Sequence, residues 1–295
     1  MNPFVVVVVA TWRRASELAR LLASLTQVQM PLAVLVVDNA DDAATQSAVD
    51  AAHGRLPVER LVPGTNLGCG GGLAYGEQVA LHRFPQATHF WLLDDDTEVC
   101  VGALEGLVSA MTAEGADIGC PMITNAQGEI GWFPGLLERK AFRVIRTAPT
   151  PAAYQAQCGD HPVRFSWATG VSLLVTRAAL EACGGHRADF WIRGEDLDFT
   201  LRLTFRGIGV FVPGAQIKHL PAPSAEDPAE RHKHALMLQN IAYISLHLPH
   251  GRRILPTLPG NVWRYLKTWG PRGIGALMNA LWRGGVLRQP GGVGR

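Results

Sequence analysis

The chain has 295 residues, of which 47% are hydrophobic and 18% are charged, and its formal net charge is +2. This balance is typical of a globular protein with one large domain, or a domain and an appendage, and it excludes an intrinsically disordered chain. Five dispersed cysteines without a CxxC pair argue against a disulfide framework and a structural zinc site. No stretch of the sequence approaches the ~18 apolar residues of a membrane span.

The first part of the chain alternates predicted strands with predicted helices. No basic segment precedes the apolar run at residues 4–9, so we expect a buried strand there and not a signal peptide. Runs of β-branched residues are typical of parallel strands buried on both faces, and apolar residues spaced by three and four indicate helices. The predicted strands are 5–10, 32–37, 58–62, 90–93 and 117–123, and the predicted helices are 16–25, 43–53, 73–83 and 101–111, with a glycine-rich loop at 64–72. This alternation predicts a doubly wound α/β fold with a mixed sheet.

The pattern loosens after residue 123. Residues 126–165 contain several Gly and Pro and predict loops or a short hairpin, and residues 165–176 look extended, with Gly170 among them. Further predicted elements are helices 178–183, 195–206, 234–248 and 274–282, strands 209–213 and 215–219, and a disordered end at 289–295. We therefore divide the chain into a first domain, residues 1–230, and a helical C-terminal region, residues 231–295.

The charge of these two parts differs. All 25 acidic residues lie at or before Glu230, whereas ten of the 27 Lys and Arg residues follow it, interleaved with Trp263, Trp269 and Trp282. Aromatic and basic residues without acids suit an anionic membrane surface, bound through residues 250–295. A helical tail packed on the first domain or on a partner chain explains the same pattern equally well. Nucleic acid is not expected as a partner, because no recognition module is present.

Three consecutive aspartates, Asp94, Asp95 and Asp96, follow the apolar strand at 90–93. Open α/β sheets bind ligands at the carboxyl ends of their strands, and packed carboxylates repel one another unless a cation neutralises them. Hard oxygen ligands suit Mg²⁺ or Mn²⁺, and Mg²⁺ is commonly held by carboxylates together with substrate phosphates. The triplet therefore predicts a metal–diphosphate site, and a solvated turn is the alternative.

Two other segments carry candidate nucleotide-binding residues. Asp38 ends the second predicted strand, where a carboxylate can accept hydrogen bonds from a base or a ribose, and a turn is the alternative. The segment 66–72 precedes a helix, and its glycines allow the backbone to approach a phosphate. It is neither a GxGxxG fingerprint after the first strand nor a P-loop. Its candidate contacts are Asn66, Gly68, Gly70 and Gly71.

Acidic residues also open the predicted helix at 195–206. Acidic side chains in a first turn interact favourably with the helix dipole, which accounts for Glu195, Asp196 and Asp198. Three acids in four residues also suit a general base aimed into a cleft. His219 follows about twenty residues later, where a returning strand brings it near the acidic edge. An imidazole suits Mn²⁺ as one ligand among oxygens, although a lone histidine is more often structural.

These segments together resemble family 2 glycosyltransferases. The resemblance rests on the strand at 5–10 with Thr11 and Arg13, the strand end Asp38-Asn39, the loop at 66–76, the run FWLLDDD at 90–96 and the run FWIRGED at 190–196 with Arg202. It covers residues 4–220 and looks closest to the bacterial galactofuranosyltransferase and rhamnosyltransferase branch. That branch often has Asp-Asp where Glu195-Asp196 stands, which leaves the choice of base between the two open.

The resemblance implies a GT-A type fold that binds a nucleotide-diphosphate sugar over residues 1–230, with the helical C-terminal region as an appendage. In this family pattern the catalytic base would be Asp196, with Glu195 beside it. The metal ion, Mn²⁺ or Mg²⁺, would be held by Asp94, Asp96 and His219. The nucleotide would be bound by Thr11, Arg13, Asp38, Asn66, Gly68, Gly70, Gly71, Asp94 and Asp95. The implied donor is UDP- or dTDP-linked, with galactofuranose or rhamnose favoured.

The implied reaction is an inverting transfer to a hydroxyl of a glycan or lipid-linked glycan, in the synthesis of cell-surface polysaccharide. We expect a cytoplasmic enzyme that is peripheral on the inner face of the cell membrane. Two other functions stay open, a sugar-1-phosphate nucleotidyltransferase and a non-catalytic nucleotide- or glycan-binding relative. A nucleotidyltransferase would have a glycine-rich basic loop after the first strand, where this chain has ATWRR at 10–14. A Rossmann dehydrogenase is disfavoured because the glycine fingerprint is missing there. The oligomeric state is not readable from the sequence.

Overall fold

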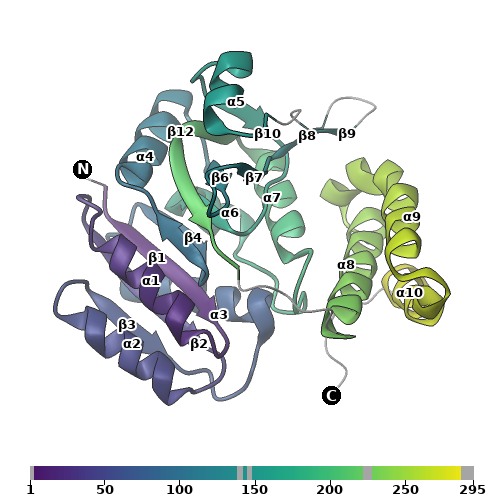
Figure 1. The fold of residues 1–295 in the computed structure, drawn as a ribbon, viewed down its shortest axis with the longest axis horizontal. Helices are drawn as coiled ribbons and strands as arrows, with labels where there is room; N and C mark the ends of the chain where they lie inside the picture. Colours follow the sequence, from purple (N-terminus) through teal and green to yellow (C-terminus); the bar gives the residue numbers. More distant parts are fainter. Residues whose placement is uncertain (1–2, 138–141, 145–147, 222–227, 287–295) are drawn as a thin grey trace.

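A computed structural model describes residues 3–137, 142–144, 148–221 and 228–286, and the predicted disordered end at 289–295 lies outside these residues. Figure 1 shows an α/β part built on one large sheet, with the C-terminal helices gathered at its side. Among the described helices, none is long and apolar enough to cross a membrane.

The central sheet is mixed, as predicted. Its path runs β10-β12-β6-β11-β4-β1-β2-β3, and β5 and β7 pair with β12 and β6. Strands β1 to β4 are mutually parallel where they pair, whereas β11 runs antiparallel to both β4 and β6. The strands are β1 (Val5–Thr11), β2 (Leu32–Asp38), β3 (Val58–Leu61), β4 (His89–Asp94), β5 (Thr97–Val99), β6 (Ile118–Thr124), β7 (Ile130–Trp132), β10 (Val163–Phe165), β11 (Ser172–Thr176) and β12 (Gly209–His219), and β8 (Gly135–Leu137) and β9 (Phe142–Val144) form a separate pair.

Helices cover both faces of this sheet because its central strands are apolar on both sides. In β1 the side chains of Val5, Val7 and Val9 enter one core cluster and those of Val6 and Val8 enter the other. Successive residues of a strand point to opposite faces, so an unbroken valine run requires a layer on each side. The first cluster includes residues of α1 (Ala15–Leu25), α2 (Ala43–His53) and α4 (Ala103–Glu114), and the second includes residues of α3 (Gly68–Arg83), α5 (Pro151–Cys158), α6 (Arg177–Cys183) and α7 (Glu195–Arg206).

The α/β part of the structure differs from the sequence-based expectation at several places. The glycine-rich segment expected to be a loop through residue 72 is helical from Gly68, as the start of α3. The region 126–165 contains a helix, α5, which was not predicted. The two strands expected at 209–213 and 215–219 are one strand, β12, whose pairing with β6 shifts register between Val212 and Gln216. A bulge of this kind adds residues without ending the strand.

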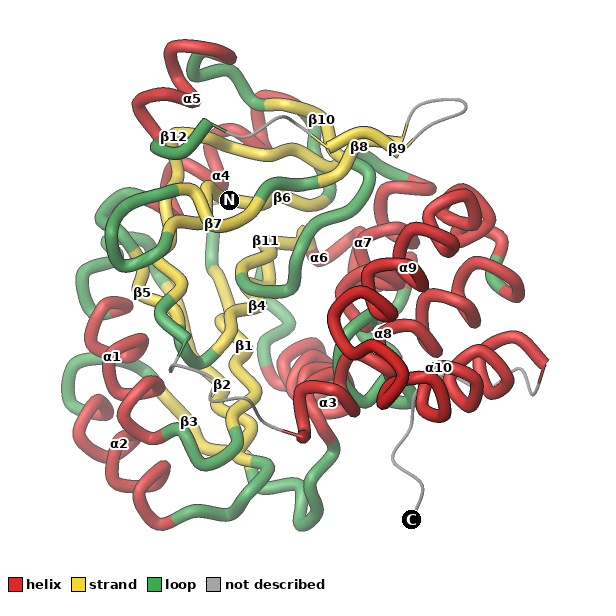
Figure 2. Tube along the Cα trace, turned by 45° about the vertical axis from the view of Figure 1, so that its right-hand side comes forward, coloured by secondary structure: helices red, strands yellow, loops and turns green. Residues whose placement is uncertain are grey.

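The C-terminal helices form a compact group beside the α/β part, visible at the right of Figures 1 and 2. The group consists of α8 (Pro228–His247), η1 (Pro249–Thr257), α9 (Leu258–Trp269), η2 (Gly270–Gly273), α10 (Ile274–Leu281) and a π-helical turn, η3 (Trp282–Val286). Its own core contains Leu238, Tyr265 and Leu277, which are buried. The predicted helices at 234–248 and 274–282 correspond to α8 and α10, and α9 was not predicted.

Candidate functional site

The carboxyl ends of three parallel strands lie side by side and carry the acidic residues. The strand register pairs Thr11 of β1 with Asp38 of β2, and Ala10 of β1 with Asp94 of β4. The ends of β1, β2 and β4 therefore form one edge of the sheet. This is the edge at which open α/β sheets bind ligands.

Asp95 is held by the first strand and the segment after it. One of its carboxylate oxygens accepts a hydrogen bond from Thr11 Oγ1 at 2.7 Å, and the other accepts one from Arg14 Nη1 at 3.1 Å. Arg14 also donates to Asp96 Oδ2 at 2.8 Å. Burial raises the pKa of Asp95, although the hydrogen bond from Thr11 and the charge of Arg14 oppose this rise. Arg14 thus partly neutralises two acids of the triplet.

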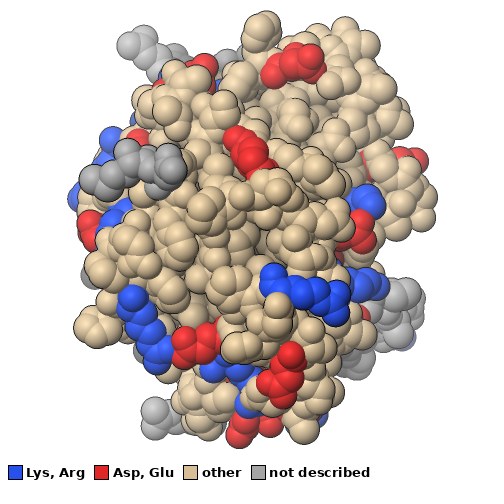
Figure 3. All heavy atoms as spheres, turned by 90° about the vertical axis from the view of Figure 1, so that its left-hand side faces the viewer, with Lys and Arg blue, Asp and Glu red and all other residues tan. Residues whose placement is uncertain are grey.

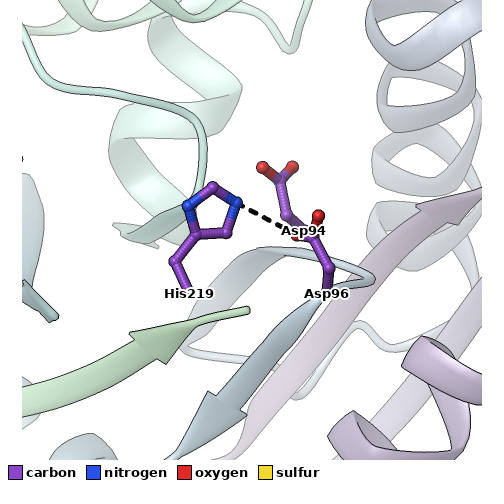
Figure 4. Close-up of side chains that lie close together, drawn as sticks. All are labelled: Asp94, Asp96 and His219. Atoms are coloured by element: carbon purple, nitrogen blue, oxygen red, sulfur yellow. Dashed lines mark ion pairs between the residues drawn. The ribbon is translucent and has the colours of Figure 1, made fainter. Parts of the chain in front are cut away.

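Asp94, Asp96 and His219 lie together, each offering one ligand atom, and these atoms are all within 4.8 Å of one another (Figure 4). Strand β12 brings His219 to this place, because its end pairs with β5 directly after the triplet. His219 Nε2 is 3.2 Å from Asp96 Oδ1. Burial, together with the neighbouring charges of Asp96 and Asp95, raises the pKa of Asp94 to about 7. Burial also raises the pKa of Asp96, but His219 and Arg14 outweigh it, so that this pKa is lowered.

This cluster fits a divalent cation. The side chain of Asp96 is 5% exposed, and its Oδ1 atom faces His219 Nε2 at 3.2 Å. Two carboxylates and one imidazole form a donor set that suits Mn²⁺ or Mg²⁺. A cation there would relieve the repulsion that contributes to the raised pKa of Asp94.

A cavity of about 570 Å³ opens above this edge of the sheet. Its lining includes many of the predicted residues, namely Thr11, Asn66, Gly68, Asp94, Asp95, Glu195, Asp196 and His219. It also includes residues that the sequence reasoning did not select, namely Trp12, Arg14, His186, Trp191 and Lys233. The second set contains two indole rings and two cations, which are groups suited to a nucleobase and a diphosphate.

Four predicted nucleotide contacts do not line this cavity, namely Arg13, Asp38, Gly70 and Gly71. Asp38 is fully buried, and its oxygens accept hydrogen bonds from the backbone N–H groups of Ala40 and Asp42 and from Arg60. This arrangement favours the alternative in which Asp38 starts a turn, and the carboxylate must exchange a partner before it can bind a ribose. Arg13 lies with its guanidinium 5.0 Å from the ring centre of Trp12. The neighbouring residue Arg14 contacts the acids instead.

The glycines at the start of α3 pack against protein backbone. A Cβ atom on Gly70 would lie 2.0 Å from the carbonyl oxygen of Phe190, and one on Gly71 would lie 2.9 Å from Leu67 Cβ. The Gly70 N–H donates to the carbonyl of Trp191 at 3.3 Å. Gly70 therefore allows α3 to approach the segment before α7, whereas a Cβ atom on Gly71 would crowd Leu67 directly before the helix, and Gly68 lines the cavity.

Asp196 occupies the first turn of α7 and is held by two backbone amides. Its Oδ2 accepts a hydrogen bond from the Gly170 N–H at 3.0 Å, and its Oδ1 accepts one from the Leu197 N–H at 2.7 Å. Burial raises the pKa of Asp196 and these hydrogen bonds oppose the rise. Burial and the charge of Asp196 raise the pKa of Glu195 to about 8, and Glu195 Oε2 has no hydrogen-bond partner among the described residues. Asp196 is therefore the better stabilised carboxylate.

The turn before these acids has unusual backbone angles. Arg193 has a φ of 59° and Gly194 a φ of 105°, both in the region that L-residues rarely adopt. Helix α8 holds the turn, because the Asn240 side chain donates to the carbonyl of Arg193 at 2.8 Å and Arg193 Nη2 donates to Glu230 at 2.5 Å. The C-terminal region also reaches α7 itself, through a 2.8 Å contact between His250 Nε2 and Asp198 Oδ1.

A buried pair beneath the cavity was missed by the sequence reasoning. Glu77 of α3 contacts His186 twice, through its Oε1 to the ring Nδ1 and through its Oε2 to the backbone N–H, each at 2.7 Å. The ring of His186 stacks on Phe199, with centroids 4.1 Å apart. Its Nε2 has no hydrogen-bond partner in the described chain, and the residue lines the cavity. Neither residue belongs to a sequence motif, so only the fold reveals the pair.

Comparison with known proteins places this site in context. The family profile described as "Glycosyltransferase like family 2" matches residues 2–236. No curated protein matches the chain. The structure of S. aureus TarS 1-349 in complex with UDP-GlcNAc is similar over 98% of this chain and 82% of that chain, with a TM-score of 0.62 at 17% identity. The mannosyltransferase PcManGT from Pyrobaculum calidifontis, in complex with GDP-Man and Mn²⁺, is similar over 95% of this chain and 79% of that chain, with a TM-score of 0.55 at 19% identity. GalNAc-T7 with UDP, GalNAc and Mn²⁺ has a TM-score of 0.59 at 15% identity, over 95% of this chain and 58% of that chain.

Proposed function

Because the chain belongs to glycosyltransferase-like family 2 and is a glycosyltransferase with the GT-A fold, we propose that it is an inverting, metal-dependent enzyme that uses a nucleotide-diphosphate sugar. UDP-galactofuranose and dTDP-rhamnose are the proposed donors, as the sequence resemblance implies. The proposed acceptor is a hydroxyl of a glycan or lipid-linked glycan. The observation that carries the proposal is one cavity whose lining includes Asp94 and His219 of the acidic cluster together with Asp196.

The residues of the acidic edge are proposed to hold the diphosphate of the donor. Asp94, Asp96 and His219 would hold Mn²⁺ or Mg²⁺, which when bound neutralises the negative charge that develops on the leaving diphosphate. Arg14 lies at the same edge and supplies a fixed positive charge. Trp12 is 43% exposed and offers an indole face to the nucleobase. GDP-Man with Mn²⁺ in the mannosyltransferase neighbour supports this kind of donor.

Asp196 rather than Glu195 is proposed as the catalytic base. A base must be ionised before it accepts a proton, and the pKa of about 8 keeps Glu195 protonated at neutral pH. Two backbone N–H groups fix the orientation of the Asp196 carboxylate. Asp196 would accept the proton of the acceptor hydroxyl while that oxygen attacks the anomeric carbon. His186, oriented by Glu77, would offer a ring nitrogen to the donor sugar.

Inversion follows from this assignment. A retaining double displacement needs a carboxylate nucleophile next to the anomeric carbon in addition to an acid–base residue. With Glu195 protonated and Asp196 assigned as the base, no carboxylate at this end of the cavity is proposed as a nucleophile. A single displacement by the acceptor hydroxyl then breaks the anomeric carbon–oxygen bond to the diphosphate from the opposite side.

The proposed test is a panel of nucleotide sugars with Mn²⁺ or Mg²⁺, scored by thermal shift and by donor hydrolysis. On the donor that is turned over, Asp196→Asn should lower transfer by about 10²–10⁴-fold, the usual contribution of a general base, and should retain nucleotide binding. Asp50→Asn on the outer helix α2 is the matched control and should behave as wild type. Near-normal transfer by Asp196→Asn would show that the base is elsewhere. Binding of nucleotide sugars without any turnover would support the non-catalytic alternative.

We further propose that the C-terminal region lies on an anionic membrane face, which makes the enzyme peripheral and cytoplasmic. Several large apolar side chains there are exposed, among them Trp263 and Met278 at 63% each and Trp282 at 55%. Lys267 lies 5.3 Å from the ring centre of Trp263, so that basic and aromatic groups alternate on this surface. The face seen in Figure 3, turned away from the C-terminal helices, mixes positive and negative side chains instead.

A further inference from the structure

A second cavity, of about 630 Å³, lies between the α/β part and the C-terminal helices. We refer to it as the second cavity, and its lining is Trp132, Trp167, Arg193, Gly194, Asp196, Leu197, Met237, Ile241, Ile254, Thr257, Gly260, Asn261 and Arg264. Its size is within the range of small-molecule sites.

The second cavity meets the nucleotide cavity at the proposed base. Arg193 and Asp196 line both cavities. The Asp196 carboxylate, fixed by its two backbone amides, therefore stands between a space for the donor and another space. An acceptor in the second cavity would reach the base without passing through the donor position.

One wall of the second cavity is apolar. The rings of Trp132 and Trp167 meet edge to face, with centroids 5.1 Å apart and an interplanar angle of 75°. Met237, Ile241 and Ile254 continue this wall from α8 and η1, and belong to the third core cluster of the protein. Indole faces suit the C–H face of a sugar ring, and the aliphatic side chains suit a hydrocarbon.

Polar residues at the start and along one side of α9 also line the second cavity. Thr257, Asn261 and Arg264 follow one another at spacings of four and three residues, which places them on one helix face. They supply a hydroxyl, an amide and a guanidinium. The same helix buries Tyr265 on a second face and exposes Trp263 and Leu266 on a third. One helix thus joins the second cavity to the surface proposed to contact a membrane.

We propose that the second cavity binds the acceptor, and that this acceptor is a glycoside with an apolar aglycone. The inference rests on the proposed glycosyl transfer and names its second substrate. The sugar lies by the tryptophan pair with its hydroxyl at Asp196, and the aglycone lies along Met237, Ile241 and Ile254. In the reaction, the acceptor oxygen forms a bond to the anomeric carbon while the bond to the diphosphate breaks. The proton passes to Asp196, and the nucleoside diphosphate leaves with the electron pair.

Gly260 allows a specific test, because nothing lies within 4 Å of a Cβ atom built on it and its φ is not in the left-handed region. A tryptophan at this position therefore meets no backbone strain, and because Gly260 lines the second cavity we expect the ring to take up space there. Gly275 on α10 is a matched control, since a Cβ atom there also meets nothing within 4 Å and the residue does not line the second cavity. The variants are Gly260→Trp and Gly275→Trp.

Binding is measured with octyl and methyl β-D-glucopyranoside, below the micelle concentration of the octyl compound, by titration calorimetry. We expect wild type and Gly275→Trp to bind the octyl glycoside at least tenfold more tightly than the methyl glycoside, because buried methylene groups add affinity. Gly260→Trp should lose this binding while its affinity for UDP or dTDP stays within twofold of wild type. Equal affinity for the two glycosides, or unchanged octyl glycoside binding by Gly260→Trp, would overturn the inference. Failure of wild type to bind either nucleotide would instead refute the proposed function.

Discussion

Replacing Gly194 by alanine tests whether the turn before α7 positions the proposed catalytic base, Asp196. The φ of Gly194 is 105°, and a Cβ atom there would lie 2.8 Å from Asn240 Cβ. The backbone conformation costs a non-glycine residue about 1–3 kcal/mol, and the steric overlap adds about 1–3 kcal/mol. We expect Gly194→Ala to lower the free energy of unfolding by about 2–6 kcal/mol. Since domains have about 5–15 kcal/mol of stability, the variant should still fold.

The same substitution should reduce activity more than nucleotide binding. Relief of the overlap moves the turn away from α8, and the turn leads directly into Glu195 and Asp196. A displacement of about 1 Å at a catalytic group lowers the rate by about 10²-fold. The acidic cluster at the other end of the cavity does not depend on this turn, so UDP or dTDP affinity should stay close to that of wild type.

The measurements are urea unfolding, steady-state transfer and nucleotide titration, with Gly214→Ala as the control. Gly214 has no atom within 4 Å of a built Cβ and no left-handed φ, so its substitution should cost little. If Gly194→Ala matches Gly214→Ala in both stability and transfer rate, then the strained turn does not fix the catalytic residues and the reasoning is refuted.

Three further predictions concern the metal, pH and the membrane. Saturating Mn²⁺, at 100 times its Kd, should raise the free energy of unfolding by about 2.7 kcal/mol. His219→Ala should remove most of this gain. Melting temperatures that respond to neither Mn²⁺ nor a chelator would exclude the metal site. Burial raises the pKa of Glu195 from 4.5 to about 8, so its contribution to stability is present below pH 4.5 and is lost as the pH rises to 8. Glu195→Gln should therefore be more stable than wild type at pH 8 in urea unfolding, and a stability difference that does not grow between pH 4.5 and pH 8 would contradict the assignment. Binding to anionic liposomes should weaken with salt, because each basic residue near the surface contributes about 1 kcal/mol. Binding should also fall in the double variant Trp263→Gln, Trp282→Gln. If this variant cosediments with the liposomes as well as wild type does, the C-terminal region is not a membrane surface.

The sequence predicted the sheet edge well because its signals are local. The central strands are continuous apolar runs, and the parallel order brings Thr11 and the triplet to one edge without further information. His219 was placed near the acids only by counting residues to a returning strand. The structure brings it there through β12, although the register shift in that strand is not visible in the sequence.

Other features depend on contacts between distant residues. The glycines of α3 predict a loop because glycine weakens an isolated helix by about 1 kcal/mol each, but close packing against Phe190 and Trp191 requires them within the helix. Helix α5 had local signals that were overlooked, since Thr150 caps it and Pro151 occupies its first turn. The second cavity depends on two parts of the chain that meet only after folding, so no sequence pattern could indicate it.

The contact between Asn240 and the Arg193 carbonyl has a consequence for the order in which the enzyme matures during translation. The turn, Glu195 and Asp196 leave the ribosome before α8 does, and their supports at Glu230, Asn240 and His250 follow tens of residues later. A nascent chain can therefore complete most strands of its nucleotide-binding sheet while the segment bearing the base is still without its brace. If Asp196 is the base as proposed, we expect competence for sugar transfer only once α8 and η1 have docked.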